Sequence, residues 1–200
     1  DLEEIVKTNF SNHKNIFRAD SMAMILIILS LMLAVSFTPA SAAPVAAPAA
    51  DGEGTMTVNL LTVTYGTVNT FVFTFTANIG DFGAGSQVAL TIPAGWTTPT
   101  TASGAGRVTV ASGTCTLSGS PPFGISGSTI FIDMASCTSG QSFTVTYAGV
   151  TAPAVIGSPY TFLTQTDIGP GGQGLVDITA GSPTVTVDPA TLTVSAAGLT

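Results

Sequence analysis

The sequence predicts an all-β protein, a sandwich of about seven to nine short strands with Greek-key connections, and three observations favour this fold. Apolar and polar residues alternate in many short segments after residue 54, as they do in half-buried strands. Glycine, proline and serine separate these segments, as they do in turns. No stretch after residue 43 shows the spacing of apolar residues that an amphipathic helix requires.

Each predicted strand is centred on a small set of alternating apolar residues. In chain order these sets are Met56, Val58 and Leu60, then Val63 and Tyr65; Phe71, Phe73 and Phe75; Val88, Leu90 and Ile92; Val108 and Val110, with Cys115 and Leu117 just beyond; Ile130 and Ile132; Phe143, Val145 and Tyr147; Tyr160 and Phe162; Leu175, Val176 and Ile178; Val185 and Val187. The adjacent Leu60 and Leu61 indicate a one-residue slip in the first segment. Pro93 ends the third segment because proline cannot donate to a strand ladder.

The first 42 residues have the features of a leader that contains a signal peptide. The apolar run MILIILSLMLAV over residues 24–35 follows Lys14 and Arg18 and precedes the small residues 40–42, Ala-Ser-Ala. A charged flank, a short apolar segment and a small-residue cleavage site define a secretory signal. A membrane anchor is the alternative, although a spanning helix needs about 20 apolar residues. We therefore expect a signal-peptide helix, cleavage after Ala42, and contact with the membrane only through this segment.

Composition divides the rest of the chain into three parts. Residues 43–54 form an Ala/Pro-rich stretch without periodicity, which predicts a short linker. Residues 55–188 contain all the alternating segments and predict the sandwich. Residues 189–200 begin a further alternation at Leu192 and Val194, which predicts the truncated start of a following repeat. We expect that strand to have nothing to pair with.

Charge excludes one class of partner. The net charge is −7 and the isoelectric point is near 4.1, whereas nucleic-acid binding requires a basic patch. Only 8% of the residues are charged, and Arg107 is the only basic residue after residue 18. We expect no nucleic-acid partner.

Cys115 and Cys137 are the only two cysteines, and both follow the predicted signal peptide. An even number of cysteines in an oxidising compartment predicts a disulfide. A redox or metal-binding pair is the alternative, but the two residues lack CxxC spacing and no histidine follows residue 43. The sequence therefore predicts a structural disulfide in a secreted or cell-surface protein.

Candidate catalytic groups are sparse, so we expect no enzymatic activity and no cofactor. Nucleophilic catalysis by serine usually needs a histidine or lysine base, and neither occurs after residue 43. The acidic residues are scattered beside turns: Asp51, Glu53, Asp81, Asp133, Asp167, Asp177 and Asp188. We interpret them as solvated turn residues rather than as a carboxylate pair. No calcium-loop motif is present, although Asp81 and Asp167 lie in glycine-rich loops that leave a weak calcium site open.

Trp96 is the only tryptophan and lies in the predicted turn IPAGWT. An aromatic side chain that covers one end of a sandwich core is the commoner arrangement, whereas an exposed tryptophan can stack on a sugar. The sequence leaves both interpretations open, and Trp96 is the only candidate for ligand contact.

Several segments together resemble a known group of proteins. They are VALTIPAGWTTPT (residues 88–100), GQSFTVTYAGVTAP (140–153), SPYTFLTQTD (158–167) and SPTVTVDPA (182–190). The region from Gly54 to Val187 resembles the immunoglobulin-like repeat modules of large secreted bacterial surface and adhesin-type proteins. The resemblance implies an immunoglobulin-like sandwich that acts as a spacer or adhesive contact, with neighbouring repeats of the same protein as partners.

The predicted function is accordingly that of a non-catalytic extracellular structural or adhesive module of a cell-surface protein. Two alternatives remain. One is a carbohydrate-binding module that uses Trp96, with a cell-surface or carbohydrate ligand. The other is a filament subunit that a neighbour completes by strand donation.

Overall fold

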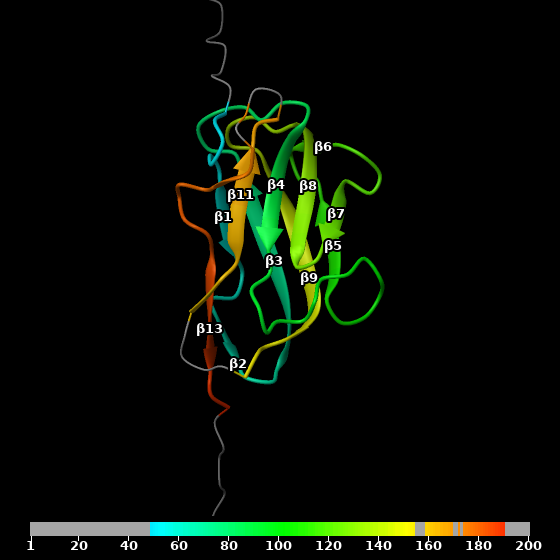
Figure 1. Cartoon of the computed structure of the whole chain (residues 1–200), viewed down its shortest axis with the longest axis vertical. Helices are drawn as coiled ribbons and strands as arrows, with labels where there is room; N and C mark the ends of the chain where they lie inside the picture. The colour runs from blue at the N-terminus through cyan, green and yellow to red at the C-terminus, as the bar shows by residue number, and fades with distance from the viewer. Residues whose placement is uncertain (1–48, 155–158, 170–171, 173, 191–200) are drawn as a thin grey trace, which may run out of the picture. The chain divides into compact units, whose positions relative to one another are not determined.

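The computed structural model describes residues 49–154, 159–169, 172 and 174–190, and these residues contain strands and loops but no helix (Figure 1). The all-β prediction is therefore confirmed for this part of the chain. The expected leader, residues 43–48 of the expected linker and residues 191–200 lie outside the described residues.

Three sheets form the domain. The first has the order β1–β3–β9–β5, formed by β1 (Thr55–Val58), β3 (Val68–Thr76), β9 (Ser142–Thr151) and β5 (Arg107–Ala111), all antiparallel. The second has the order β12–β11–β4–β8–β6, formed by β12 (Val176–Asp177), β11 (Leu163–Asp167), β4 (Ser86–Thr91), β8 (Thr129–Ser136) and β6 (Thr116–Leu117); β7 (Phe123–Ser126) also pairs with β8. The third has the order β10–β13–β2, formed by β10 (Pro159–Thr161), β13 (Thr184–Asp188) and β2 (Thr62–Thr64).

The core is formed by the inward residues of these strands in a sandwich-like arrangement. Because side chains alternate along a strand, Phe71, Phe73 and Phe75 of β3 all point inward and are fully buried. Val145 of β9 lies opposite Phe73 in the neighbouring strand and is also buried. Strands β4 and β8 contribute further fully buried residues, namely Val88, Leu90, Ile130 and Ile132.

The described residues form thirteen strands, more than the seven to nine expected, because several short pairings lie in segments that were expected to be loops or single strands. The slip at Leu60 and Leu61 is one such place. There the chain leaves β1 in the first sheet and continues as β2, which pairs in parallel with β13 in the third sheet. Val63 is buried after this change, whereas Leu61 is 68% exposed.

Residues 49–54 differ from the expected linker because they pack on the domain. Ala49 is buried, and its N–H donates to the carbonyl of Asp81 at 3.1 Å. The N–H of Gly52 donates to Thr166 O, and Gly52 O accepts from Thr179 N at 2.9 Å. The small side chains of this segment let its backbone approach β11 and the β12 region closely. A side chain at Gly52 would lie 2.9 Å from the carbonyl of Asp177.

The chain enters and leaves the domain at opposite ends of β3. Thr55, the first residue of β1, pairs with Thr76, the last residue of β3. At the other end of β3, the carbonyl of Asp188, the last residue of β13, accepts from the N–H of Tyr65 at 2.9 Å. Figure 1 shows β1 and the end of β13 far apart along the long axis. We call the region around Thr55 and Thr76 the leading end, and the region around Tyr65 and Asp188 the exit end.

Candidate functional site

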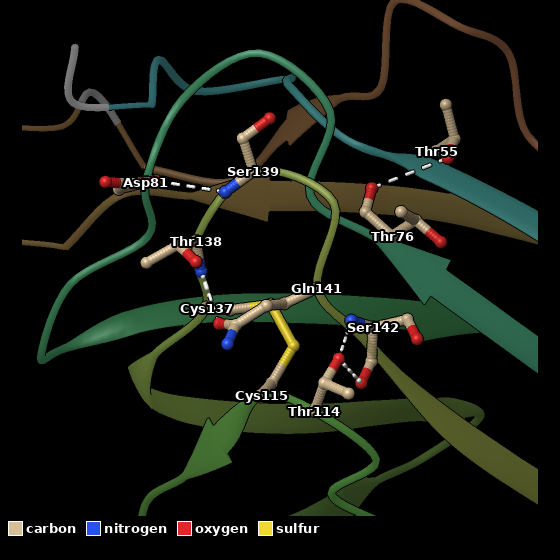
Figure 2. Close-up of a disulfide and its surroundings, with 10 residues drawn as sticks. All are labelled: Thr55, Thr76, Asp81, Thr114, Cys115, Cys137, Thr138, Ser139, Gln141 and Ser142. Carbon is tan, nitrogen blue, oxygen red and sulfur yellow. Dashed lines mark hydrogen bonds between the residues drawn. A yellow bond between two sulfur atoms is a disulfide. The ribbon is translucent and has the colours of Figure 1, made fainter. Parts of the chain in front are cut away.

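The predicted disulfide between Cys115 and Cys137 is confirmed and lies near the leading end (Figure 2). Cys115 directly precedes β6 and Cys137 directly follows β8, two strands that pair in one sheet through Thr116 and Ser136, so the bond lies at the end of this ladder. The two residues are 5% and 0% exposed. A buried disulfide is typical of a structural bond rather than of an exposed redox pair.

Hydrogen bonds fix the loop that follows Cys137. The N–H of Thr138 donates to Gln141 Oε1 at 2.8 Å, and the N–H of Ser139 donates to Asp81 Oδ1 at 2.9 Å. The N–H of Ser142 donates to Thr114 Oγ1 at 2.9 Å, which ties the residue before Cys115 to the start of β9 (Figure 2). Asp81, expected as a turn residue, therefore holds two loops together.

Asp51 and Asp167 lie close together at the leading end, which the sequence did not predict. Asp51 Oδ1 accepts from the N–H of Ile168 at 2.9 Å, and Asp167 Oδ1 accepts from the N–H of Gly169 at 2.8 Å. A Cβ at Gly172 would lie 2.7 Å from Asp51 Oδ1 and 2.5 Å from Asp167 Oδ1. Both carboxylates thus accept backbone N–H groups of one loop. Only glycine at position 172 lets the two carboxylates lie this close to the backbone there.

The other acidic groups do not form a cluster with these two. Asp133 accepts from the side chain of Gln87 at 2.8 Å, and Asp177 accepts from the side chain of Gln165 at 2.9 Å. Glu53 Oε2 is buried and has no hydrogen-bond partner among the described residues. Within the described part of the chain, no three His, Cys, Asp or Glu side chains are grouped as a metal site requires.

Trp96 lies in the core at the exit end, where it is 7% exposed. Its ring makes edge-to-face contacts with three aromatic side chains, at centroid distances of 5.3 Å to Phe71, 5.5 Å to Tyr160 and 5.3 Å to Phe162. Its buried indole N–H has no hydrogen-bond partner among the described residues. The surrounding aromatic faces can accept such a group weakly. The geometry therefore favours the core interpretation of Trp96 over sugar stacking.

Tyr147 holds the Trp96 loop against the first sheet, which the alternating pattern did not reveal. The Tyr147 side chain is fully buried on β9, and its hydroxyl donates to the carbonyl of Thr97. Thr97 Oγ1 also accepts from the N–H of Thr151 at 3.0 Å. Burial raises the pKa of the Tyr147 hydroxyl above its ordinary value, because the ionised form would lose its hydration.

We expect Tyr147→Phe to lower the free energy of unfolding by about 1–3 kcal/mol, because the half-buried Thr97 carbonyl loses its donor. The raised pKa also makes the wild type less stable at high pH. Above pH 10.0 the unfolded tyrosine loses its proton while the folded one keeps it. The free energy of unfolding should then fall by about 1.4 kcal/mol per pH unit.

Urea denaturation at pH 8 to 11.5 measures both effects. The phenylalanine variant should lack this part of the pH dependence. The exposed Tyr65, replaced by phenylalanine, is the matched control and should change stability by less than about 0.5 kcal/mol. A Tyr147→Phe variant as stable as the wild type would contradict the proposed anchoring of the loop.

A hollow of about 310 Å³ opens beside Trp96. Residues 92–99 and Ser128 line it, and none of these side chains is charged. Isoleucine, proline, alanine and tryptophan form the apolar wall of its lining, and threonine and serine are its polar residues. It lies after β4, on the exit side of the core.

None of the described residues belongs to a helix long and apolar enough to cross a bilayer.

Comparison with known proteins gives only weak structural similarities. No known protein family matches the chain, and no curated protein sequence matches it. The crystal structure of BslA, a bacterial hydrophobin, is similar with a TM-score of 0.42 and 13% identity, over 72% of this chain and 100% of that one. The sixth cohesin of scaffoldin B from Acetivibrio cellulolyticus, solved with a Cel5 dockerin, has a TM-score of 0.35 and 12% identity, over 69% of this chain and 99% of that one. Similarities this weak give no information on function.

Proposed function

We propose that this domain is a non-catalytic, immunoglobulin-like structural module of an exported cell-surface protein, which spaces neighbouring modules or contacts a surface. The position of its chain ends carries the proposal. The chain enters the domain beside the last residue of β3. It leaves the domain beside the turn that precedes the first residue of β3. The nine residues of β3 span about 30 Å. Each module with this connectivity lengthens a chain of modules instead of folding it back.

Two further observations support the structural role. The buried Cys115–Cys137 disulfide is of the kind that persists in oxidising, extracytoplasmic compartments. The last described strand, β13, comes from the same chain, and its Val185 and Val187 are fully buried in the core. The domain therefore needs no strand from a neighbour to complete this part of its core, which disfavours strand donation.

The carbohydrate-binding alternative receives less support. Stacking on a sugar requires an exposed aromatic face. Trp96 is 7% exposed and is surrounded by other aromatic rings, so its faces are not free for this contact.

A head-to-tail fusion tests the spacer function. Two copies of residues 43–195 joined in one chain should have a maximum dimension at least about 30 Å greater than one copy, measured by small-angle X-ray scattering. The same two copies joined through a flexible Gly/Ser linker are the control for linker length. A compact, side-by-side pair would contradict the proposal, and so would reproducible turnover of a substrate by the purified domain.

A further inference from the structure

The hollow beside Trp96 is lined by uncharged residues, although Asp188 lies at the same end of the domain. Residues 92–99 and Ser128 around the hollow carry no charged side chain. Asp51, Glu53, Asp81 and Asp167, by contrast, all belong to segments bonded to one another at the leading end. The hollow therefore presents an uncharged surface to whatever adjoins it, whereas four acidic residues belong to the leading end.

Two large apolar side chains are exposed at the exit end, Tyr65 in the turn before β3 and Val68 at the first position of β3. Tyr65 is 44% exposed and Val68 is 70% exposed. Between them, the N–H of Gly66 donates to the carbonyl of Ala152 at 3.4 Å. A Cβ at Gly95 would lie 3.3 Å from Pro153, which follows Ala152. The Tyr65 turn and the loop that lines the hollow thus both lie beside residues 152–153.

An uncharged segment with apolar residues follows β13 directly beside the exit end. The hydrogen bond from Tyr65 N–H to Asp188 O fixes the end of β13 beside the turn. The residues that follow, TLTVSAAGLT over 191–200, contain no charge and place Leu192 and Val194 at alternate positions. Leu192 is four residues beyond Asp188 and can reach about 13 Å from it. A tethered segment acts at a high effective concentration, so even a weak contact is populated.

We propose that residues 191–195 dock on the exit end, where Leu192 and Val194 cover the Tyr65 turn and the apolar wall of the hollow beside Trp96. This inference rests on the proposed spacer function and adds a partner surface to it. The first residues after β13 form a joint that fixes the direction in which the next module leaves. The covalent tether supplies most of the affinity, so the contact itself adds little stability. Removal of the segment therefore changes the surroundings of the exit-end residues without a large change in the melting temperature of the domain.

Trp96 provides a specific probe, because a protein with one tryptophan gives one indole N–H signal in a ¹H–¹⁵N NMR spectrum. The exported chain that ends at Thr200 is compared with the same chain ended after Ala190. Truncation should shift the Trp96 indole signal and the backbone signals of residues 65–68. The signals of Cys115 and Cys137, at the other end, should stay in place and show that the domain is still folded.

Point variants in the full chain separate docking from chain length. Leu192→Ser combined with Val194→Ser should reproduce the shifts caused by truncation. The matched control, Thr193→Ala, changes the side chain that alternation places on the opposite face and should leave the signals in place. Coincident spectra of the full and truncated chains would overturn the proposal. Shifts that appear only at high protein concentration would also overturn it, because a second copy would then be the occupant.

The outcomes for the joint and for the spacer are distinguishable. If the spectra coincide but the two-copy fusion is still extended, the joint is wrong and the spacer function stands. If truncation shifts the signals but the two-copy fusion is compact, the segment docks without serving an extended array.

Discussion

Replacing Phe71 with alanine is expected to lower the free energy of unfolding by about 3–5 kcal/mol. Phe71 is fully buried, and its ring lies 5.3 Å from Trp96, 5.8 Å from Phe162, 6.2 Å from Phe73 and 6.4 Å from Tyr147. Truncation removes apolar area and leaves a cavity that four large rings cannot easily fill. Urea denaturation followed by Trp96 fluorescence measures the effect.

Val68→Ala is the matched control on the same strand. Val68 is 70% exposed, so its truncation should change the free energy of unfolding by no more than about 0.5 kcal/mol. A loss of less than about 1 kcal/mol for Phe71→Ala would mean that the site collapses around the cavity. The aromatic cluster would then be far less rigid than its contacts indicate.

The core of this domain could be predicted from the sequence because one physical rule determines it. Strand side chains alternate between two faces, so the inward set of β3 and β9 follows directly from the order of residues. The Cys115–Cys137 bond was predictable for a different reason, since a chain with only two cysteines allows only one intramolecular pairing.

The features that the sequence did not predict depend on contacts between distant segments. The parallel pairing of β2 with β13 joins residues more than a hundred positions apart, and nothing local distinguishes it from a continued first strand. Thr164 and Thr166 occupy fully buried positions that a polarity pattern assigns to the surface. Their hydroxyl groups are satisfied there by the carbonyls of Phe162 and Glu53, at 3.2 and 2.9 Å.

The candidate sites also depend on contacts between segments that are distant in the sequence. The proximity of Asp51 to Asp167 arises only when residues 49–54 fold onto β11, and the Ala/Pro-rich composition of that region had indicated a linker. Composition describes how a segment behaves alone, whereas the carbonyl of Thr166 and the N–H of Thr179 provide partners that the isolated segment lacks. The Tyr147 hydroxyl was equally unpredictable, because its acceptor, Thr97, lies fifty residues earlier.

Removing the disulfide by Cys115→Ala combined with Cys137→Ala is expected to lower the free energy of unfolding by about 3 kcal/mol. The bond closes a loop between residues 22 positions apart, and its loss gives the unfolded chain more conformations. The wild type should first show, by mass spectrometry without reductant, a mass lower by two hydrogen atoms than the reduced chain.

Chemical reduction of the wild type separates the two contributions of the cysteines. Reduction opens the loop but leaves both sulfur atoms in the core, whereas the double alanine variant opens the loop and also removes buried volume at Cys115 and Cys137. The reduced wild type should therefore lie between the oxidised wild type and the variant in urea denaturation. Equal stability of the reduced and oxidised wild type would show that loop closure contributes nothing. Two free thiols in exported protein would contradict the disulfide itself, and with it the argument that the domain matures in an oxidising compartment.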